Sequence, residues 1–215
     1  MEQEIVAENS RKGSKQLLCL PFEFNKDDKL GPWDILLSEH AIGDIQVLEI
    51  SYGIKATEAA MKKLWQISSG KWNKYDLIRK VSPSRNIPVY EVEVPHYDGL
   101  KIVWQIDHGF SVRSQSLSQH VKIWAITSNQ EQINSILEKL EIVHQVYNTE
   151  HKSRCEFQQM NENGVILPIC FGDEQKTKSM DDYPEMDGEK LLEVHKILIN
   201  NKFFPLSKVN NASFL

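Results

Sequence analysis

The sequence predicts an α+β fold in which helices pack on an antiparallel sheet. Apolar residues recur at helical spacing in two early segments, and strict alternation replaces this spacing farther along the chain. Helical spacing then returns. The predicted elements are helices over 38–49 and 55–69, strands over 88–94, 100–107 and 121–127, and a last helix after 128. Helices that precede and follow a run of strands in this way are typical of a helical layer on an antiparallel sheet.

Local signals support the two early helices. Ser38 is a good N-cap, and a short strand over 33–37 precedes it. The apolar residues of the first helix follow at helical spacing: Ala41, Ile42, Ile45 and Leu48. The second helix has an apolar face formed by Ala60, Leu64 and Ile67. Gly70 is its stop signal.

The alternating segments each have one apolar face. In the first strand this face is Tyr90, Val92 and Val94, and residues 95–99 form a hairpin loop to the next strand. The second strand presents Leu100, Ile102, Trp104 and Ile106. We expect these rows to be buried, and we expect 109–119 to be a polar loop. Residues 128–131 have the form of a capping box before the last helix.

Composition limits the class of protein. The chain of 215 residues has 30 acidic and 25 basic residues, a net charge of −5, and 40% hydrophobic residues. No apolar run approaches the roughly 20 residues that span a bilayer, and the N-terminus lacks the apolar core of a secretory signal. Three cysteines are too few for a disulfide framework. We therefore expect no membrane partner and an intracellular location, nuclear or cytoplasmic.

Basic residues are concentrated in one stretch. Residues 55–85 hold eight basic residues and two acidic ones, a net charge of +6, whereas the rest of the chain sums to −11. Trp65, Trp72 and Tyr75 lie in the same stretch. Lysine and arginine attract phosphates and aromatic rings stack on unpaired bases, so this mixture favours single-stranded nucleic acid. The alternative is a solvated helix face and loop, with the tryptophans in the core.

Other candidate sites are weaker. Lys101 and Lys122 fall on the strand face opposite the apolar row, where they are either phosphate contacts or ordinary surface lysines. His151 and Cys155 are one helical turn apart, but without a second ligand pair a free helical cysteine is the preferred interpretation. Asp107 and His108 resemble part of a triad, but no nucleophile elbow occurs and strand neighbours point to opposite faces. No phosphate-binding glycine-rich motif occurs in the chain.

Several segments resemble known proteins. The order of elements, together with residues 88–91, 100–107 and 121–126, is similar to the RelE/ParE toxin family. A closer resemblance is to fungal proteins in which a toxin-like domain precedes a UvrD-like superfamily 1 helicase, relatives of the tetratricopeptide and ankyrin repeat-containing helicase. This resemblance covers about residues 33–207. It is carried by Trp33 to Ser38, Ile87 to Glu91 and Lys101 to Asp107, and continues through Arg154-Cys155, Val165 to Pro168 and the stretch 193–207.

The resemblance implies a RelE/ParE-like domain over 31–140, after a flexible lead-in over 1–30 and before a helical extension and acidic linker over 141–215. It implies a nucleic-acid-binding accessory module, with single-stranded RNA or other nucleic acid and a downstream helicase domain as partners. No cofactor or metal is expected in this chain, because ATP and Mg would belong to the helicase domain. The expected binding residues are Lys62, Lys63, Lys71, Lys74, Arg79, Lys80, Arg85, Lys101 and Lys122.

Two alternatives stay open. One is a metal-independent RelE-like endoribonuclease that uses Lys101 and Lys122 as its catalytic cations. Lys101 falls where the toxins carry a strand arginine, and lysine lacks the bidentate fork of arginine. No late catalytic tyrosine can be matched either, so the binding module is preferred. The other alternative is a protein-interaction or regulatory module for the helicase motor. Acidic or apolar cover over the basic sheet face would favour it.

Overall fold

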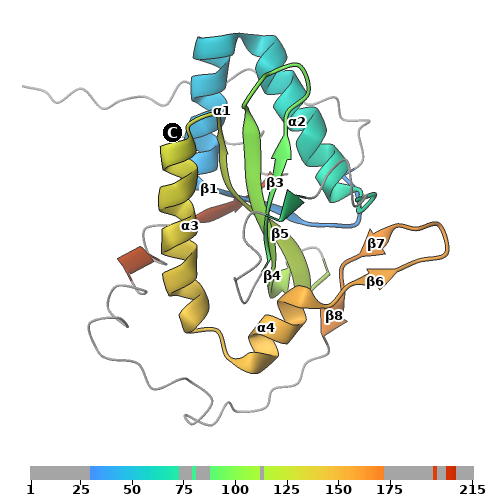
Figure 1. Ribbon diagram of the computed structural model, residues 1–215. Coiled ribbons are helices and arrows are strands. Elements are labelled where there is room, and N and C mark those ends of the chain that lie inside the picture. The colour runs from blue at the N-terminus through green and yellow to red at the C-terminus, as the bar shows by residue number, and fades with distance from the viewer. Residues whose placement is uncertain are drawn as a thin grey trace, which may run out of the picture.

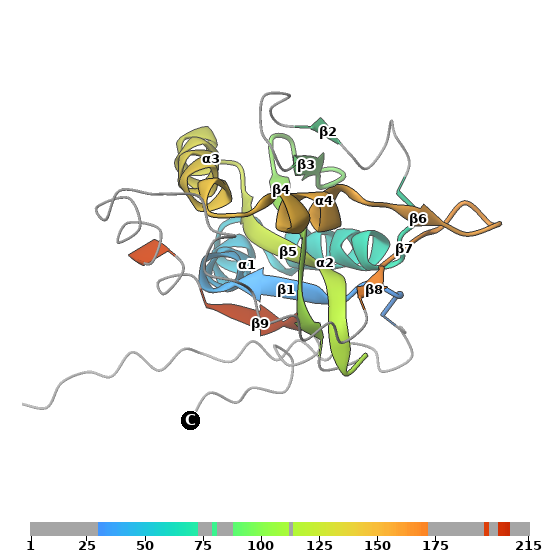
Figure 2. The same cartoon turned by 90° about the horizontal axis from the view of Figure 1, so that it is seen from below.

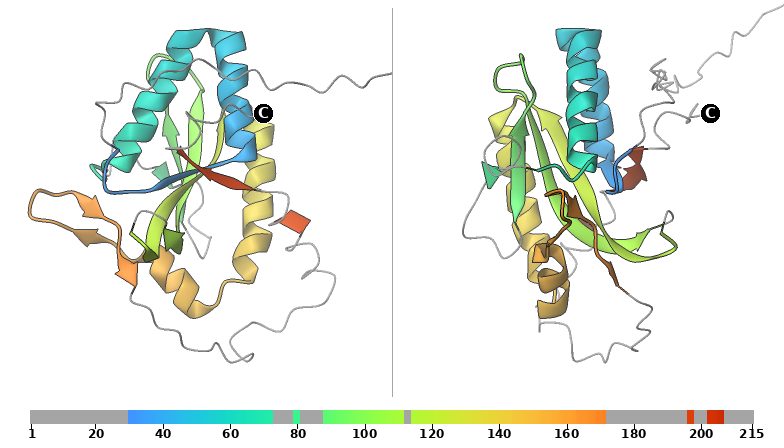
Figure 3. Two further views of the ribbon diagram at one scale, coloured as in Figure 1. Left: turned by 180° about the vertical axis from the view of Figure 1, so that it is seen from behind. Right: turned by 90° about the vertical axis from the view of Figure 1, so that its right-hand side faces the viewer.

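Helices cover both faces of a mixed sheet. The computed structural model describes residues 30–72, 79–80, 88–111, 114–171, 196–197 and 202–206. The strands lie in the order β2-β3-β4-β5-β1-β9, and β8 pairs with β5. In Figure 3, α1 and α2 lie on one side of the sheet, and α3 and α4 lie on the other. The α+β class predicted from the sequence is confirmed.

The antiparallel centre of the sheet also agrees with the prediction. It consists of β3 (Val89–Glu93), β4 (Lys101–Ser111) and β5 (Ser116–Thr127), paired in that order. The predicted polar loop over 109–119 is wrong, because β4 and β5 stay paired as far as Ser111 and Ser116. The side chains there are polar, but both backbones extend the ladder.

Short strands widen the sheet at both edges. β1 (Ile35–Ser38) runs parallel to β5, so the sheet is mixed rather than purely antiparallel. β9 (Phe203–Pro205) pairs with β1, and β8 (Cys170–Phe171) pairs with β5. β2 (Arg79–Lys80) pairs with β3 at the other edge. β8 and β9 thus bring the segment after residue 140 back to the central sheet (Figure 2).

The helix hairpin forms where the capping signals predict it. α1 (Glu39–Tyr52) begins after Ser38, whose hydroxyl oxygen accepts a hydrogen bond from the Ala41 amide at 3.0 Å. The same hydroxyl donates to the carbonyl oxygen of Trp124 at 2.8 Å, so one side chain both caps the helix and joins it to β5. α2 (Ile54–Ser68) follows Gly53 and ends before Gly70, which has a positive φ of 70°.

Two apolar cores lie on opposite faces of the sheet. The larger core lies between the sheet and the α1–α2 hairpin, and it includes the two predicted strand rows. Val92, Val94 and the whole row from Leu100 to Ile106 are buried there, and Tyr90 is half-buried. The smaller core packs α3 (Gln130–Gln145) on the other face through Ile133, Ile136, Leu137 and Leu140.

The second face continues with α4. Asn148 caps α4 (Thr149–Glu156), and its side chain accepts a hydrogen bond from the His151 amide at 2.8 Å. α4 lies across the end of β4 in Figure 1. The small hairpin of β6 (Gln159–Met160) and β7 (Ile166–Leu167) follows it.

Gly70 joins this hairpin to the end of α2. Its carbonyl oxygen accepts a hydrogen bond from the Ile166 amide at 2.9 Å, and the Trp33 indole donates to the Ile166 carbonyl oxygen at 2.7 Å. A Cβ atom at position 70 would lie 2.0 Å from that carbonyl oxygen. Close backbone approach and positive φ therefore both require glycine.

We predict that Gly70→Ala lowers the free energy of unfolding by about 2–3 kcal/mol. Left-handed strain costs roughly 1–2 kcal/mol, and displacing Ile166 loses a hydrogen bond worth about 1 kcal/mol. Gly164 has a similar φ of 73° but open space around its Cβ position, so Gly164→Ala isolates the strain and should cost about 1–2 kcal/mol. Urea unfolding followed by tryptophan fluorescence measures both. Equal losses would show that the contact with Ile166 contributes nothing.

Candidate functional site

The predicted basic residues do not lie on one surface. Lys62 on α2 and Lys71 just after it are exposed, whereas Lys63 is buried with 8% of its surface accessible. Arg79 and Lys80 form β2, of which only the backbone is described. Lys74 and Arg85 lie outside the described residues.

The two sheet lysines lie on the opposite face from α2. Lys101 shares its face with Val103, which packs in the core beneath α3, and Lys122 pairs in register with Gln105 on that same face. The Lys101 ammonium lies 3.4 Å from Glu91 Oε2, and the Lys122 ammonium lies 2.7 Å from Asp107 Oδ2. Both side chains are about four-fifths buried. Each lysine is thus paired with a carboxylate beneath or beside the second helical layer.

Trp72 lies in the larger core. It is 6% exposed, its indole donates to the Ile67 carbonyl oxygen at 2.7 Å, and its ring centroid lies 5.0 Å from that of Trp104. The ring centroid of Trp33 lies 4.7 Å from that of Trp72. Trp72 therefore contributes to stability and does not offer a face for a base to stack on.

A polar cluster centred on Asp107 lies where α4 crosses the sheet. The Asp107 side chain is 1% exposed, and its carboxylate accepts hydrogen bonds from four side chains, including the Cys155 thiol, and from one backbone amide. Oδ2 accepts from Lys122 at 2.7 Å and from the Tyr147 hydroxyl at 3.0 Å. Oδ1 accepts from His151 Nε2 at 2.8 Å and from the His108 amide at 2.8 Å. These donors come from both central strands, from α4 and from the loop before it.

The surroundings of Asp107 keep it charged. Burial alone would raise the pKa of this carboxyl, but the Lys122 charge and the His151 hydrogen bond together hold it well below its usual value of 3.8. The same burial and the nearby carboxylate raise the pKa of the Tyr147 hydroxyl and of the Cys155 thiol. The Cys155 sulfur lies 3.7 Å from Asp107 Oδ1. Cys155 is therefore a protonated thiol and not an activated nucleophile.

Histidines surround this cluster. The His151 ring stacks on His108 at 4.0 Å between centroids and on Tyr147 at 3.8 Å. Burial lowers the pKa of His108 and of His120 to about 4, so both rings are neutral near pH 7. His144 Nε2 contacts Gln105 Oε1 at 3.1 Å. In the described part of the protein, His108 and His120 each keep a buried ring nitrogen without a hydrogen-bond partner.

The sequence contains the parts of this cluster but not their arrangement. The spacing of His151 and Cys155 does place both side chains on one helix face, as the sequence suggested. As strand neighbours, Asp107 and His108 are expected to point to opposite faces. In the structure both contact His151, which hydrogen-bonds to Asp107 and stacks on His108. Asp107 follows Lys101 and Gln105 on the polar row of its strand, so the strand pattern alone gives no signal that this carboxylate is buried.

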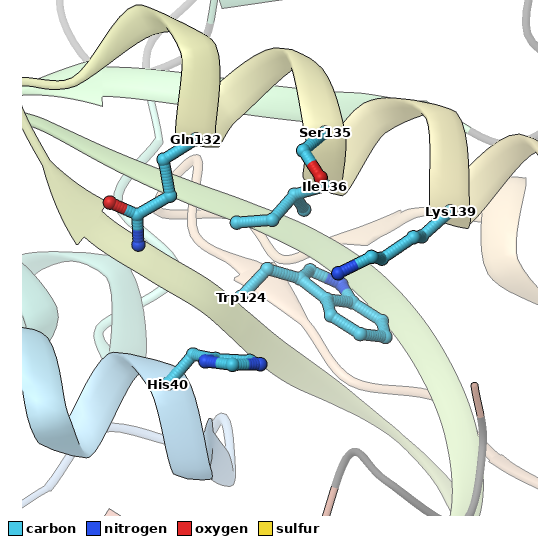
Figure 4. A pocket seen from close by; sticks show the side chains of 6 residues that line it. All are labelled: His40, Trp124, Gln132, Ser135, Ile136 and Lys139. Atoms are coloured by element: carbon cyan, nitrogen blue, oxygen red, sulfur yellow. The ribbon is translucent and has the colours of Figure 1, made fainter. Parts of the chain in front are cut away.

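A small cavity opens elsewhere, between α1, α3 and β5. Its volume is about 120 Å³, and Figure 4 shows four side chains of α3 pointing toward Trp124 and His40. Those four residues are Gln132, Ser135, Ile136 and Lys139. None of the predicted nucleic-acid residues lines it.

No protein-family model, curated protein or solved structure matches this chain. Among the described helices, none is both long and apolar enough to cross a membrane. The geometry of the described residues therefore carries the functional argument.

We predict that Tyr147→Phe lowers the free energy of unfolding by about 1.5–3 kcal/mol, because it removes a buried hydrogen bond to a charged group. Tyr52→Phe is the matched control, since within the described residues the Tyr52 hydroxyl has a single hydrogen-bond partner, the exposed Ser128 hydroxyl at 3.2 Å. The control should lose less than about 0.5 kcal/mol. Chemical denaturation of both variants at pH 7 measures the difference, and equal losses would contradict a stabilising role for the Asp107 cluster.

Proposed function

We propose that this chain is a nucleic-acid-binding accessory module of a superfamily 1 helicase, and that single-stranded RNA contacts it along α2 and the basic segment that follows. The observation that carries this proposal is the exposure of Lys55, Lys62 and Lys71 on or just after α2. In the part of the chain that the structure describes, no ion pair neutralises any of the three. Unpaired surface lysines of this kind are available to phosphates.

The sequence carries further positive charge after Lys71. Lys74, Arg79, Lys80 and Arg85 come directly after Lys71, with Asp76 as the only acidic residue among them. The helicase association depends on the sequence resemblance. The order β1, α1, α2 and then an antiparallel three-stranded centre agrees with the helix, helix, strand order of the RelE/ParE proteins, and this agreement supports the resemblance.

The geometry argues against the ribonuclease alternative. A ribonuclease site needs cations that face the developing charge on phosphate. Lys101 and Lys122 instead pair with Glu91 and Asp107, under a layer formed by α3 and α4. We therefore restrict the proposed binding residues to the α2 side and leave the sheet lysines out.

Two observations favour the protein-interaction alternative. Acidic partners and the layer of α3 and α4 cover the two sheet lysines, which is the cover that this alternative predicts. The second observation is a group of exposed apolar side chains. Four large apolar side chains are exposed where α1 joins α2: Val47, Ile50, Tyr52 and Ile54. Exposed apolar groups gathered at one place often mark a protein interface. An adjoining helicase domain is the partner that the resemblance implies for this surface.

We predict that a fluorescein-labelled single-stranded RNA binds the chain weakly, and that affinity falls as salt rises. The double substitution Lys62→Ala with Lys71→Ala should flatten the log–log salt dependence by about one unit for each lysine that contacts a phosphate. Fluorescence anisotropy at several salt concentrations measures this slope.

The charge-matched control is Lys139→Ala with Lys152→Ala, since both lysines lie on the second helical layer. This control should keep the wild-type slope. If both double variants flatten the slope equally, binding reflects net charge rather than a surface on α2. No binding even at low salt would contradict the proposal and favour the protein-interaction module, and cleavage of the RNA would favour the ribonuclease.

A further inference from the structure

Three side chains with metal-binding groups converge beneath α4. Asp107 comes from β4, and His151 and Cys155 come from successive turns of α4. One ligand atom from each, Asp107 Oδ1, His151 Nε2 and Cys155 Sγ, lies within 4.8 Å of the other two. Asp107 and Cys155 are buried, whereas His151 is half-buried. The three groups thus surround one point that is reached from the His151 side.

We propose that Asp107, His151 and Cys155 form a binding site for a zinc ion. Carboxylate, imidazole and thiolate are the three ligand types that zinc uses in proteins, at about 2.0–2.3 Å from the metal. Tetrahedral geometry with those bond lengths places neighbouring ligand atoms about 3.3–3.6 Å apart. In this structure Oδ1 lies 2.8 Å from His151 Nε2 and 3.7 Å from Cys155 Sγ. Small side-chain adjustments therefore bring the ligands to coordinating distance.

The two oxygens of Asp107 have different neighbours. Oδ2 accepts from Lys122 and Tyr147, and these donors fix the orientation of the carboxylate. Oδ1 accepts from the His108 amide and is the oxygen turned toward His151 and Cys155. Metal-binding carboxylates are commonly held by hydrogen bonds from outer residues in this way, while the other oxygen binds the metal. A site of this kind is partly organised before the metal arrives.

Metal binding must release a proton. Cys155 is a protonated thiol, and zinc binds the thiolate, so the S–H bond breaks, a Zn–S bond forms and one proton leaves to solvent. The hydrogen bond between His151 Nε2 and Asp107 is replaced by one bond from each group to zinc, with the imidazole proton on Nδ1. Three protein ligands leave a fourth position for water. The site is separate from the lysines of α2 proposed to bind nucleic acid.

Cobalt(II) is the probe for this site, because it replaces zinc in tetrahedral sites and absorbs light. The 215-residue chain, purified without a histidine tag and treated with chelator, is titrated with cobalt(II). We expect one equivalent to produce visible d–d bands of a tetrahedral site and a near-ultraviolet sulfur-to-cobalt band. One equivalent of zinc should remove both. Because one thiol proton is released, affinity should rise about tenfold for each pH unit between 7 and 8.

Cysteine variants assign the sulfur ligand. Cys155→Ser should abolish the sulfur-to-cobalt band, whereas Cys170→Ser is the matched control and should keep it, because Cys170 is exposed and lies in β8. His151 is half-buried and so tolerates substitution better than the buried Asp107. His151→Gln should weaken cobalt binding at least tenfold. Circular dichroism checks that each variant is folded.

The opposite results would overturn the proposal. A folded wild-type chain that shows no tetrahedral cobalt spectrum has no such site. A band that survives in Cys155→Ser or disappears in Cys170→Ser would place the sulfur ligand elsewhere. Unchanged affinity in folded His151→Gln would exclude the imidazole and with it the three-residue site.

Discussion

The buried carboxylate of Asp107 is the group on which this end of the molecule depends. A charge in the interior is costly unless it is paired and hydrogen-bonded, so the fold must supply donors from several directions. Lys122 comes from the neighbouring strand, Tyr147 from the loop between α3 and α4, and His151 from α4. Because these three donors bond to one carboxylate, Asp107 fixes the position of α4 over β4 and β5. Cys155 of α4 then lies beside the carboxylate. The protonated thiol and the candidate zinc site both follow from that placement.

The central sheet separates two surfaces with different chemistry. The α1–α2 hairpin packs on the larger apolar core and carries exposed lysines on its outer side. The other face is covered by α3 and α4. The strand lysines on that face, Lys101 and Lys122, are paired with carboxylates. A nucleic acid that follows α2 therefore does not reach Lys101 or Lys122. This separation is the physical reason for preferring a binding module to a ribonuclease that uses the sheet lysines.

Periodicity was enough to predict the centre of the fold. The row from Leu100 to Ile106 alternates because one strand face is fully buried, and the capping signal at Ser38 is local. The ends of β4 and β5 were not predicted because most of their side chains are polar, whereas their pairing is a backbone ladder between the two strands. β1 also could not be given a parallel partner, since its pairing with β5 joins segments more than 80 residues apart.

The candidate site was less predictable from the sequence than the sheet. The sequence places His151 and Cys155 on one helical face, but it cannot show that Asp107, over 40 residues earlier, lies beneath them. Neighbouring residues of a strand point to opposite faces, so the sequence separates Asp107 from His108. It does not show that α4 crosses there and that His151 contacts both. The basic stretch was visible in composition, whereas the burial of Lys63 and Trp72 follows from helix packing and needed three dimensions.

The ionisation of Asp107 tests this account most directly. Carbon-13 labelling of the aspartates allows the pKa of the Asp107 carboxyl to be measured by NMR in the metal-free, folded chain. Because Lys122 and His151 stabilise the charged form, the midpoint should lie well below the usual 3.8. The unfolded chain binds the proton more tightly, so this carboxylate stabilises the fold above pH 3.8 and the stabilisation is lost as pH falls below it. A midpoint at or above 3.8 would show that Asp107 is not the charged centre that holds α4 in place.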